Sequence, residues 1–306
     1  MASTRARGRD VFGLLLLDKP AGISSNHALQ RVKRLYQAAR AGHTGSLDPL
    51  ATGMLPILFG SGTRLCGYLL DSRKEYRTTA TLGVATSTGD AEGEITLDRS
   101  GDSPPSADAV TDVLRRFVGE ISQVPPMYSA LKRDGVPLYR LARQGIDVER
   151  APRRVTIDAL VLEEYRWPRL TLTVQCSKGT YIRTLVEDIA VALGTVGHVA
   201  VLRRLAVLPF VGQPMHSLDS LQTVAAAGGL AALDTLLLAP ELALPGWPAV
   251  ELDADAATRL GQGQAVAAKP DWPLGKVRIY AEPQRFIALG VVTAEGRLEP
   301  QRVFRS

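Results

Sequence analysis

The sequence predicts an α+β protein that consists of a large mixed domain and a small β-rich module at the C-terminal end. Residues 11–17 form an unbroken apolar run, which is typical of a buried strand. Residues 74–83 and 170–176 alternate between apolar and polar positions, as strands do, whereas residues 25–36 carry apolar side chains at helical spacing. Residues 249–306 contain only short strand-like runs. Strands interleaved with helices predict the mixed class.

The composition is that of a globular protein. The chain has 306 residues, enough for one large or two ordinary domains. Hydrophobic residues make up 45% of it and charged residues 22%, which supports a sizeable core and argues against disorder. Cys66 and Cys176 stand far apart without metal-ligand spacing, so we expect a reduced, cytoplasmic protein with no metal. No apolar run approaches the ~20 residues of a membrane span, and no nucleotide-binding pattern suggests a cofactor.

The basic residues are concentrated in two stretches. The net charge is +5 and the pI is about 9.3. Residues 1–50, among them Arg5 and Arg7, hold eight Lys or Arg against three acidic residues. Residues 132–154 hold seven against three. A polyanionic partner would explain this distribution, although an ordinary solvated surface explains it equally well on charge alone.

The segment 42–57 is the part of the chain where a functional site is expected. Its glycines and prolines interrupt helical and strand periodicity, which predicts neither a regular helix nor a regular strand. Pro49 pushes Asp48 toward an extended conformation, so one carboxylate stands on a stiff loop near His43. An Asp-Pro pair by itself is more often a helix cap. The complete run favours chemistry on a bulky substrate, because glycines allow another backbone to come close.

The run 42–56 resembles the catalytic motif GHTGxLDPxATGxLP of the TruB family of tRNA pseudouridine synthases, and several later segments resemble that family too. The resemblance implies that Asp48 is the single obligatory catalytic aspartate. It also implies that Lys19 and Pro20 support the catalytic loop from beneath. His43 would stack in the space left by a flipped nucleotide; a hydrogen bond within the loop is the alternative.

Three later segments imply further contacts with the substrate. The K-x-Y segment at 74–76 implies that the Tyr76 ring lies against the target base, where stacking contributes roughly 1–3 kcal/mol. Residues 86–93 are similar to the family pattern T-D/S-T-G/S-D-x-x-G, in which Asp90 orients active-site groups unless it is only a turn residue. The pattern P-x-x-Y/F-S-A-x-K ends at Lys132, a candidate phosphate or active-site contact.

Arg183 is expected in the first turn of a helix that follows a strand and a glycine turn. An arginine is unfavourable at that end of the helix dipole, which predicts a partner carboxylate. The C-S/D-x-G-T-Y-I-R pattern, found across several pseudouridine synthase families, implies that this partner is Asp48. The guanidinium would lower the aspartate pKa by about 1–3 units and keep it ionised. The same pattern implies that Tyr181 contacts the uridine. Leu202, in the pattern G-x-H-x-x-x-L-R-R with a shortened spacer, would form the apolar wall of the base pocket; by its own pattern it is a core residue.

The resemblance covers nearly the whole chain and implies two domains. A pseudouridine synthase catalytic domain would span residues 1–245, with a mixed, largely antiparallel sheet and helices around it. Residues 240–248 read as a linker. Residues 249–306 occupy the position of the PUA-like RNA-binding domain of bacterial TruB proteins, an assignment that depends on order along the chain.

The implied activity is isomerisation of the T-loop uridine, position 55, of elongator tRNAs to pseudouridine. The N1 glycosidic bond breaks, the uracil turns and C5 joins C1′, without metal, redox cofactor or ATP. Asp48 could attack C1′, add to the uracil ring or abstract the C2′ proton, and the sequence leaves these routes open. The expected partner is the T arm of tRNA, bound by a monomer without an obligate protein partner. A tRNA-folding chaperone role is a further hypothesis.

Two other classes of function stay open on the sequence. One is an N-glycosidase-like hydrolase that uses Asp48 and Asp90 as a carboxylate pair and releases free uracil. The other is a non-catalytic tRNA-binding protein, for which Asp48→Asn would leave all activity intact.

Overall fold

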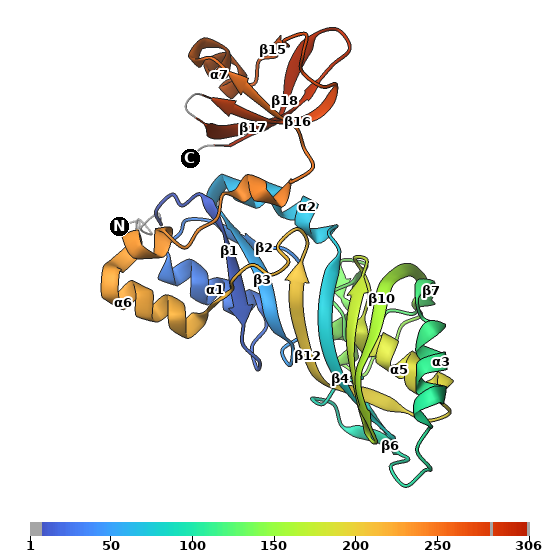
Figure 1. Cartoon of the computed structure of the whole chain (residues 1–306). Helices are drawn as coiled ribbons and strands as arrows, with labels where there is room; N and C mark the ends of the chain where they lie inside the picture. The colour runs from blue at the N-terminus through green and yellow to red at the C-terminus, as the bar shows by residue number, and fades with distance from the viewer. Residues whose placement is uncertain (1–7, 282–283, 305–306) are drawn as a thin grey trace.

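The computed structural model describes residues 8–281 and 284–304 and contains a large mixed sheet with helices around it and a smaller C-terminal sheet (Figure 1). Arg5 and Arg7 of the N-terminal basic stretch lie outside the described residues. The strand order of the large sheet is β13-β1-β3-β12-β4-β11-β10-β7, with β2 paired to β3. Its strands are β1 (Gly13–Lys19), β2 (Ala41–His43), β3 (Thr52–Phe59), β4 (Lys74–Leu82), β7 (Gly119–Gln123), β10 (Arg153–Arg166), β11 (Arg169–Cys176), β12 (Gly197–Val207) and β13 (His216–Ser217).

Most neighbouring strands of the large sheet run antiparallel, and only the pairs β1–β13 and β3–β12 are parallel. The expectation of a mixed, largely antiparallel sheet is confirmed. Two short ladders, β5 (Val84–Thr86) with β6 (Ile95–Asp98) and β8 (Lys132–Arg133) with β9 (Val136–Pro137), stand apart from it. The helices are α1 (Ser25–Leu35), η1 (Gly60–Leu65), α2 (Cys66–Leu70), α3 (Ala107–Arg115), α4 (Leu138–Ala142), α5 (Ile182–Ala192), α6 (Leu218–Asp234), η2 (Pro240–Ala243) and α7 (Ala254–Gly261). None of these helices is long and apolar enough to cross a membrane.

Local sequence explains the elements that border the site. Alternation buries Tyr76 and Leu82 on one face of β4, as a period of two requires. Helix α1 begins behind the cap residue Ser24, whose Oγ accepts a hydrogen bond from the His27 backbone N at 3.1 Å. Helices α1 and α6 lie together on one part of the large sheet, and α3 and α5 cover another (Figure 1).

The second half of the segment 42–57 is a strand, so the expectation that the whole segment lacks regular structure is wrong. Residues 53–59 of β3 are buried in the middle of the sheet, and this burial outweighs the interruption by Pro56. The Pro56 carbonyl accepts a hydrogen bond from the Thr44 N at 3.1 Å, and the proline has no N–H that could be left unpaired. Only residues 44–51 form the loop that carries Asp48.

The C-terminal sheet has the order β14-β16-β17-β18-β15 and packs against the large sheet. One hydrophobic cluster contains Leu14 and Leu16 of β1 together with Phe286 and Phe304. The segment 240–248 takes part in this packing, because η2 is a helical turn and Leu244 is buried. The segment expected to be a linker therefore also packs between the two sheets. The strands are β14 (Ala249–Leu252), β15 (Val266–Ala267), β16 (Gly275–Ala281), β17 (Arg285–Val292) and β18 (Arg297–Val303).

Candidate active site

Asp48 faces a pocket of about 400 Å³ between the 44–51 loop, the middle of the large sheet and the start of α5. This volume lies within the range of small-molecule sites, ~300–1,000 Å³. Five residues predicted for the site line the pocket together, although they come from distant parts of the chain: Asp48, Tyr76, Tyr181, Arg183 and Leu202.

The catalytic loop is held from beneath by Lys19. The Lys19 side chain is fully buried at the end of β1, and its Nζ donates hydrogen bonds to the carbonyls of Pro20 at 2.8 Å, Ile23 at 2.7 Å and Pro49 at 3.3 Å. Burial lowers the pKa of Lys19 to about 8, and the nearby Asp48 carboxylate opposes this shift. The lysine therefore connects the 44–51 loop, at Pro49, to the turn that precedes α1, at Pro20 and Ile23.

Helix α1 supports the same loop at its first residue. The Ser25 Oγ accepts a hydrogen bond from the Leu47 N at 2.7 Å and donates one to the Leu47 carbonyl at 3.1 Å. Both groups are buried, so this exchange fixes the backbone one residue before Asp48.

Arg183 joins the catalytic loop to two other segments. Its Nε lies 3.0 Å from Asp48 Oδ2 and 3.7 Å from Asp90 Oδ2. Its Nη1 donates to the Thr88 carbonyl at 2.8 Å, and its Nη2 donates to the Tyr128 carbonyl at 2.7 Å. All three guanidinium nitrogens are thus engaged, and the expected ion pair with Asp48 is present.

Arg183 lowers the pKa of Asp48, as expected, but burial outweighs it and the net shift is upward. Burial raises the pKa of Asp48, the Arg183 guanidinium opposes the rise, and the Asp90 charge adds to it. The Asp48 side chain keeps 39% of its exposure, which it directs toward the pocket, whereas Arg183 keeps 4%. Burial is the largest cause of the shift in the Asp48 pKa, although part of the side chain faces the pocket.

The floor of the pocket is formed by β4 and β12. Tyr76 of β4 stands opposite Arg204 of β12 in the antiparallel register, and Leu202 lies two residues before Arg204 on the same face. Tyr76 is 9% exposed and Leu202 is 6% exposed. Burial raises the pKa of the Tyr76 phenol, and the Arg204 guanidinium opposes that rise. The two side chains offer an aromatic and an aliphatic surface to a bound ring.

Tyr181 caps the start of α5 and is fixed by a residue that the sequence did not single out. The Gln123 side chain accepts a hydrogen bond from the Tyr181 N at 3.1 Å and donates one to the Tyr181 carbonyl at 3.3 Å. Gln123 ends β7 and is buried. Burial raises the pKa of the Tyr181 phenol.

Three predicted contacts lie outside the pocket lining. Asp90 is 4% exposed and accepts hydrogen bonds from Thr88 Oγ1 at 2.5 Å and Glu92 N at 3.1 Å, behind Arg183. His43 ends β2, and its buried Nδ1 has no hydrogen-bond partner within the described ranges. Burial and then Arg204 lower the pKa of His43, so the imidazole is neutral at pH 7. Lys132 is exposed in β8.

Among the lining residues that the sequence analysis did not propose for the site are two cations, Lys74 and Arg204. Period-two alternation could have found them, because Lys74 shares a face with Tyr76 and Arg204 shares a face with Leu202. Both are buried, and a buried cation in a pocket wall is uncommon.

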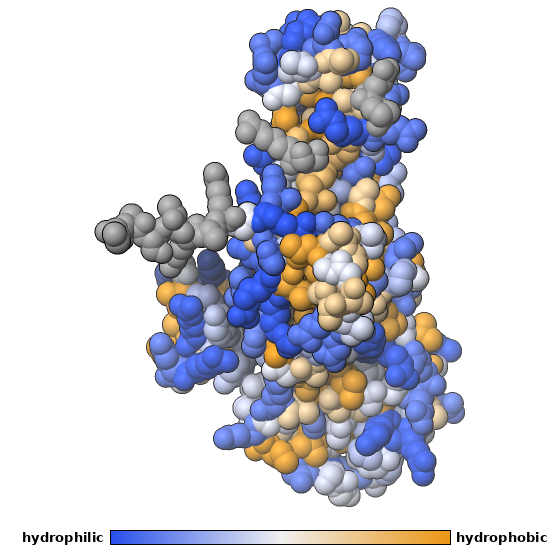
Figure 2. Space-filling view, turned by 90° about the vertical axis from the view of Figure 1, so that its left-hand side faces the viewer, coloured by the Kyte–Doolittle hydropathy of each residue, from blue (hydrophilic) through white to orange (hydrophobic). Residues whose placement is uncertain are grey.

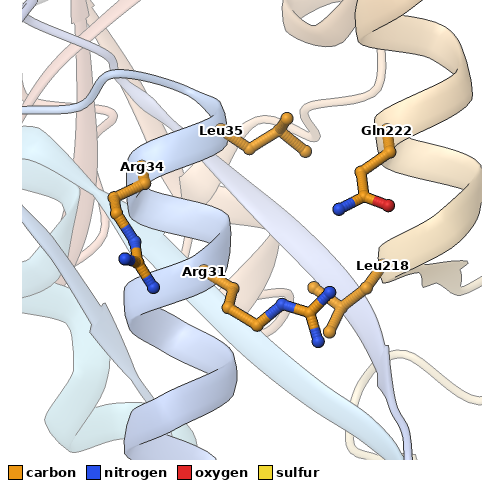
Figure 3. Close-up of a pocket in the computed structure, with 5 residues that line it drawn as sticks. All are labelled: Arg31, Arg34, Leu35, Leu218 and Gln222. Carbon is orange, nitrogen blue, oxygen red and sulfur yellow. The ribbon is translucent and has the colours of Figure 1, made fainter.

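A separate basic groove of about 350 Å³ lies between α1 and α6. Arg31 reaches from α1 toward Leu218 of α6, and the Gln222 amide points into the same gap (Figure 3). Arg34 and Leu35 complete the groove, and no carboxylate lines it. Figure 2 faces this side of the molecule, where hydrophilic side chains border an apolar patch. The groove therefore contains two basic residues of the N-terminal stretch, Arg31 and Arg34.

Family models match consecutive parts of the chain. Residues 33–182 match the N-terminal domain of TruB family pseudouridylate synthase. Residues 183–244 match the tRNA pseudouridylate synthase B C-terminal domain, and residues 248–304 match the C-terminal model of pseudouridine synthase II TruB.

Curated relatives match over the full length. tRNA pseudouridine synthase B of Pseudomonas aeruginosa (strain UCBPP-PA14) is 48% identical over 306 residues, which is 100% of both chains. The protein of the same name from Pseudomonas putida (strain F1) is 50% identical and also covers 100% of both chains. That from Nitrosococcus oceani is 50% identical over 99% of this chain and 97% of its own. These matches define the class of the protein, a pseudouridine synthase, which is an isomerase. The chain belongs to the TruB family of these enzymes, which confirms the resemblance found in the sequence.

Solved structures agree with this fold. A chain in a crystal structure of a Cbf5-Nop10-Gar1 complex superposes with a TM-score of 0.70, covering 99% of this chain and 92% of that one at 24% identity. A chain in an H/ACA RNP bound to a substrate RNA containing 2′-deoxyuridine gives a TM-score of 0.70 at 23% identity, covering 100% of this chain and 92% of that one.

Proposed function

We propose that this enzyme converts the T-loop uridine at position 55 of elongator tRNAs to pseudouridine. The observation that carries the proposal is the single carboxylate of Asp48, which faces a pocket of about 400 Å³ and is paired with Arg183 at 3.0 Å. Full-length relatives named tRNA pseudouridine synthase B support tRNA as the substrate.

The pocket accepts one nucleotide that has been turned out of folded RNA. Flipping costs a few kcal/mol, and stacking of the base on an aromatic ring returns roughly 1–3 kcal/mol. Tyr76 and Leu202 provide the two apolar surfaces for the flipped uracil, and Tyr181 closes the opposite wall. His43 is uncharged and stands beside the loop, where it fills the space that the nucleotide leaves in the RNA.

Asp48 acts on the bound nucleotide while the uracil changes its attachment to the ribose. The C1′–N1 bond breaks with its electron pair on the uracil, the ring turns, C5 bonds to C1′, the C5 hydrogen leaves as a proton, and N1 takes up a proton. The carboxylate attacks C1′, adds to the ring or takes the C2′ proton, and each route needs Asp48 deprotonated. Arg183 favours that charged form, and Asp90 positions Arg183 from behind.

Asp90 is not arranged as the second carboxylate of a hydrolase. Its Oδ1 is occupied by Thr88 and Glu92, and it does not line the pocket. A glycosidase pair would flank the scissile bond from both sides.

The tRNA T arm binds across both sheets. Catalysis belongs to residues 1–245, and residues 249–306 act as a PUA-like RNA-binding domain. Lys132, exposed two residues after Ala130 of the pocket lining, contacts a phosphate. The basic groove at Arg31 and Arg34 adds a second electrostatic contact, so affinity falls steeply with salt.

Tritium release from tRNA labelled at uracil C5 tests the proposal. Wild type releases tritium and no free uracil, whereas Asp48→Asn binds tRNA and releases neither. Asp112→Asn, an exposed aspartate of α3, is the matched control and keeps wild-type release. A tRNA with cytidine at position 55 gives no release. Free uracil would identify a hydrolase, and tRNA binding without tritium release from either protein would identify a binding protein.

A further inference from the structure

Arg204 is a buried cation in the pocket floor without a carboxylate partner among the described residues. It is 1% exposed. Its Nε donates to the Met54 carbonyl at 2.7 Å, and its Nη2 donates to the Gly45 carbonyl at 3.1 Å. A buried guanidinium is costly unless an anion compensates its charge, and backbone carbonyls supply only partial charge. By contrast, Arg183 on the opposite side of the pocket has Asp48 at 3.0 Å.

Lys74 is a second such cation in the same pocket. It is 7% exposed, and its Nζ donates to the carbonyls of Leu70 at 2.7 Å and Ser72 at 2.5 Å. These bonds cap the end of α2 and explain the position of Nζ. The Asp71 carboxylate, which itself pairs with Lys178 at 2.7 Å, offsets only part of the Lys74 charge. Burial, with Arg204 as the next cause, lowers the pKa of Lys74 to about 8, so the ammonium is still mainly charged at pH 7.

The register of β4 and β12 gathers the two cations on one side of the floor. Arg204 stands opposite Tyr76, and alternation puts Lys74 on the Tyr76 face and Leu202 on the Arg204 face. The floor therefore has two halves: Tyr76 and Leu202 offer apolar surface, and Lys74 and Arg204 offer positive charge. A ligand that fits both halves is a flat ring that carries negative charge.

We propose that Arg204 and Lys74 form a cationic seat for the uracil ring at the stage when it is detached from the ribose. The inference rests on the proposed function. When the C1′–N1 bond breaks, the electron pair stays on the uracil, and the ring anion spreads this charge over N1, O2 and O4. Fixed cations in the pocket floor stabilise this anion more than the neutral base of bound uridine. The seat also keeps the ring in place until C5 bonds to C1′ and releases its hydrogen as a proton.

The test compares variants that remove the charge of Arg204 or Lys74 with a variant that removes the charge of the neighbouring Arg203. Arg204→Gln and Lys74→Gln keep hydrogen-bonding groups and lose the charge. Arg203→Gln is the matched control, because Arg203 is the next residue of β12, faces the other side and pairs with Asp18 at 2.8 Å. For each full-length variant we would measure the single-turnover rate of pseudouridine formation at saturating tRNA, the Kd for tRNA, and free uracil.

Removal of either charge should slow the single-turnover step by ~100-fold or more, the usual effect of losing one group that stabilises a developing charge. The Kd for tRNA should stay within about threefold of wild type, since the neutral substrate base does not need the seat. Traces of free uracil are expected from Arg204→Gln, and Arg204→Lys should recover part of the rate. Arg203→Gln should match wild type in all three measurements.

Four results would overturn the seat. An equal rate loss in Arg203→Gln would mean that the strand, and not the charge, matters. A weaker Kd with an unchanged rate would assign the two cations to an RNA phosphate. If wild type makes pseudouridine and both charge variants keep the wild-type rate, the proposed seat is wrong and the proposed function stands. If wild type makes no pseudouridine, the seat and the proposed function are both wrong. If Arg204→Gln does not fold by circular dichroism, Lys74→Gln decides by the same readouts.

Discussion

The Nε of Arg183 lies 3.0 Å from Oδ2 of Asp48 and 3.7 Å from Oδ2 of Asp90. The same guanidinium donates to the carbonyls of Thr88 and Tyr128 at 2.8 and 2.7 Å. One buried side chain therefore connects the catalytic loop, the turn that carries Asp90 and the segment around Tyr128, which precedes the basic stretch 132–154. The position and charge of Asp48 depend on all three.

Arg183→Lys should lower the rate of pseudouridine formation by ~100-fold or more, because an ammonium cannot reproduce the planar fork that reaches these partners. The Kd for tRNA should change little. Single-turnover rates and filter binding measure the two effects. Arg115→Lys, in an exposed ion pair with Asp112 at 3.0 Å, is the control, and a fully active Arg183→Lys would contradict the positioning role.

Asp90→Asn should move the acid limb of the pH–rate profile to lower pH. The Asp90 charge raises the pKa of Asp48, so its removal makes Asp48 easier to ionise. Asparagine keeps an oxygen that can accept from Thr88 and Glu92. The measurement is kcat/KM across about pH 4 to 8. An acid limb that stays in place or moves to higher pH would show that Asp48 does not titrate in this limb.

The free energy of unfolding should rise between about pH 8 and 9. Lys19 and Lys74 each have a pKa lowered to about 8 in the fold from an ordinary 10.5. In this window the unfolded state holds protons that the folded state has lost, so stability rises with pH, by roughly 1 kcal/mol per lysine. Above about pH 9 the rise should level off, because burial raises the pKa of Cys66 and Cys176 from 9.0 to about 11, which has the opposite sign.

Urea unfolding at pH 8 and pH 9 measures this slope. Lys74→Met should remove about half of it, while Lys276→Met, a lysine of the C-terminal sheet with no such burial, should leave it unchanged. A slope that survives in Lys74→Met would mean that Lys74 titrates normally in the fold.

Arg31→Gln combined with Arg34→Gln should weaken tRNA binding without changing the single-turnover rate at saturating tRNA. The slope of log K against log salt should become shallower by ~1 for each phosphate contact that is lost. Arg115→Gln with Arg116→Gln on α3, which packs toward the other end of the large sheet, is the matched control. An unchanged salt slope in the Arg31 and Arg34 variant would show that the groove does not contact tRNA phosphates.

Several site residues could be read from the sequence because their signals are local. The glycine and proline pattern around Asp48, the strand alternation at Tyr76 and the misplaced positive charge of Arg183 at a helix start each need only a few neighbouring residues. The mixed, largely antiparallel class follows from such segments together with the family resemblance. The same local reasoning failed at Pro56, because burial in the centre of the sheet outweighed the usual effect of proline.

The sequence by itself determined the family, the fold class and the set of side chains that carry the chemistry. The tertiary structure decided how those side chains affect one another. Desolvation of Asp48 outweighs its arginine partner, and the register of β4 against β12 brings Lys74 and Arg204 into one pocket floor. Burial and cross-strand register arise from contacts between segments far apart in the chain, so no local pattern contains them.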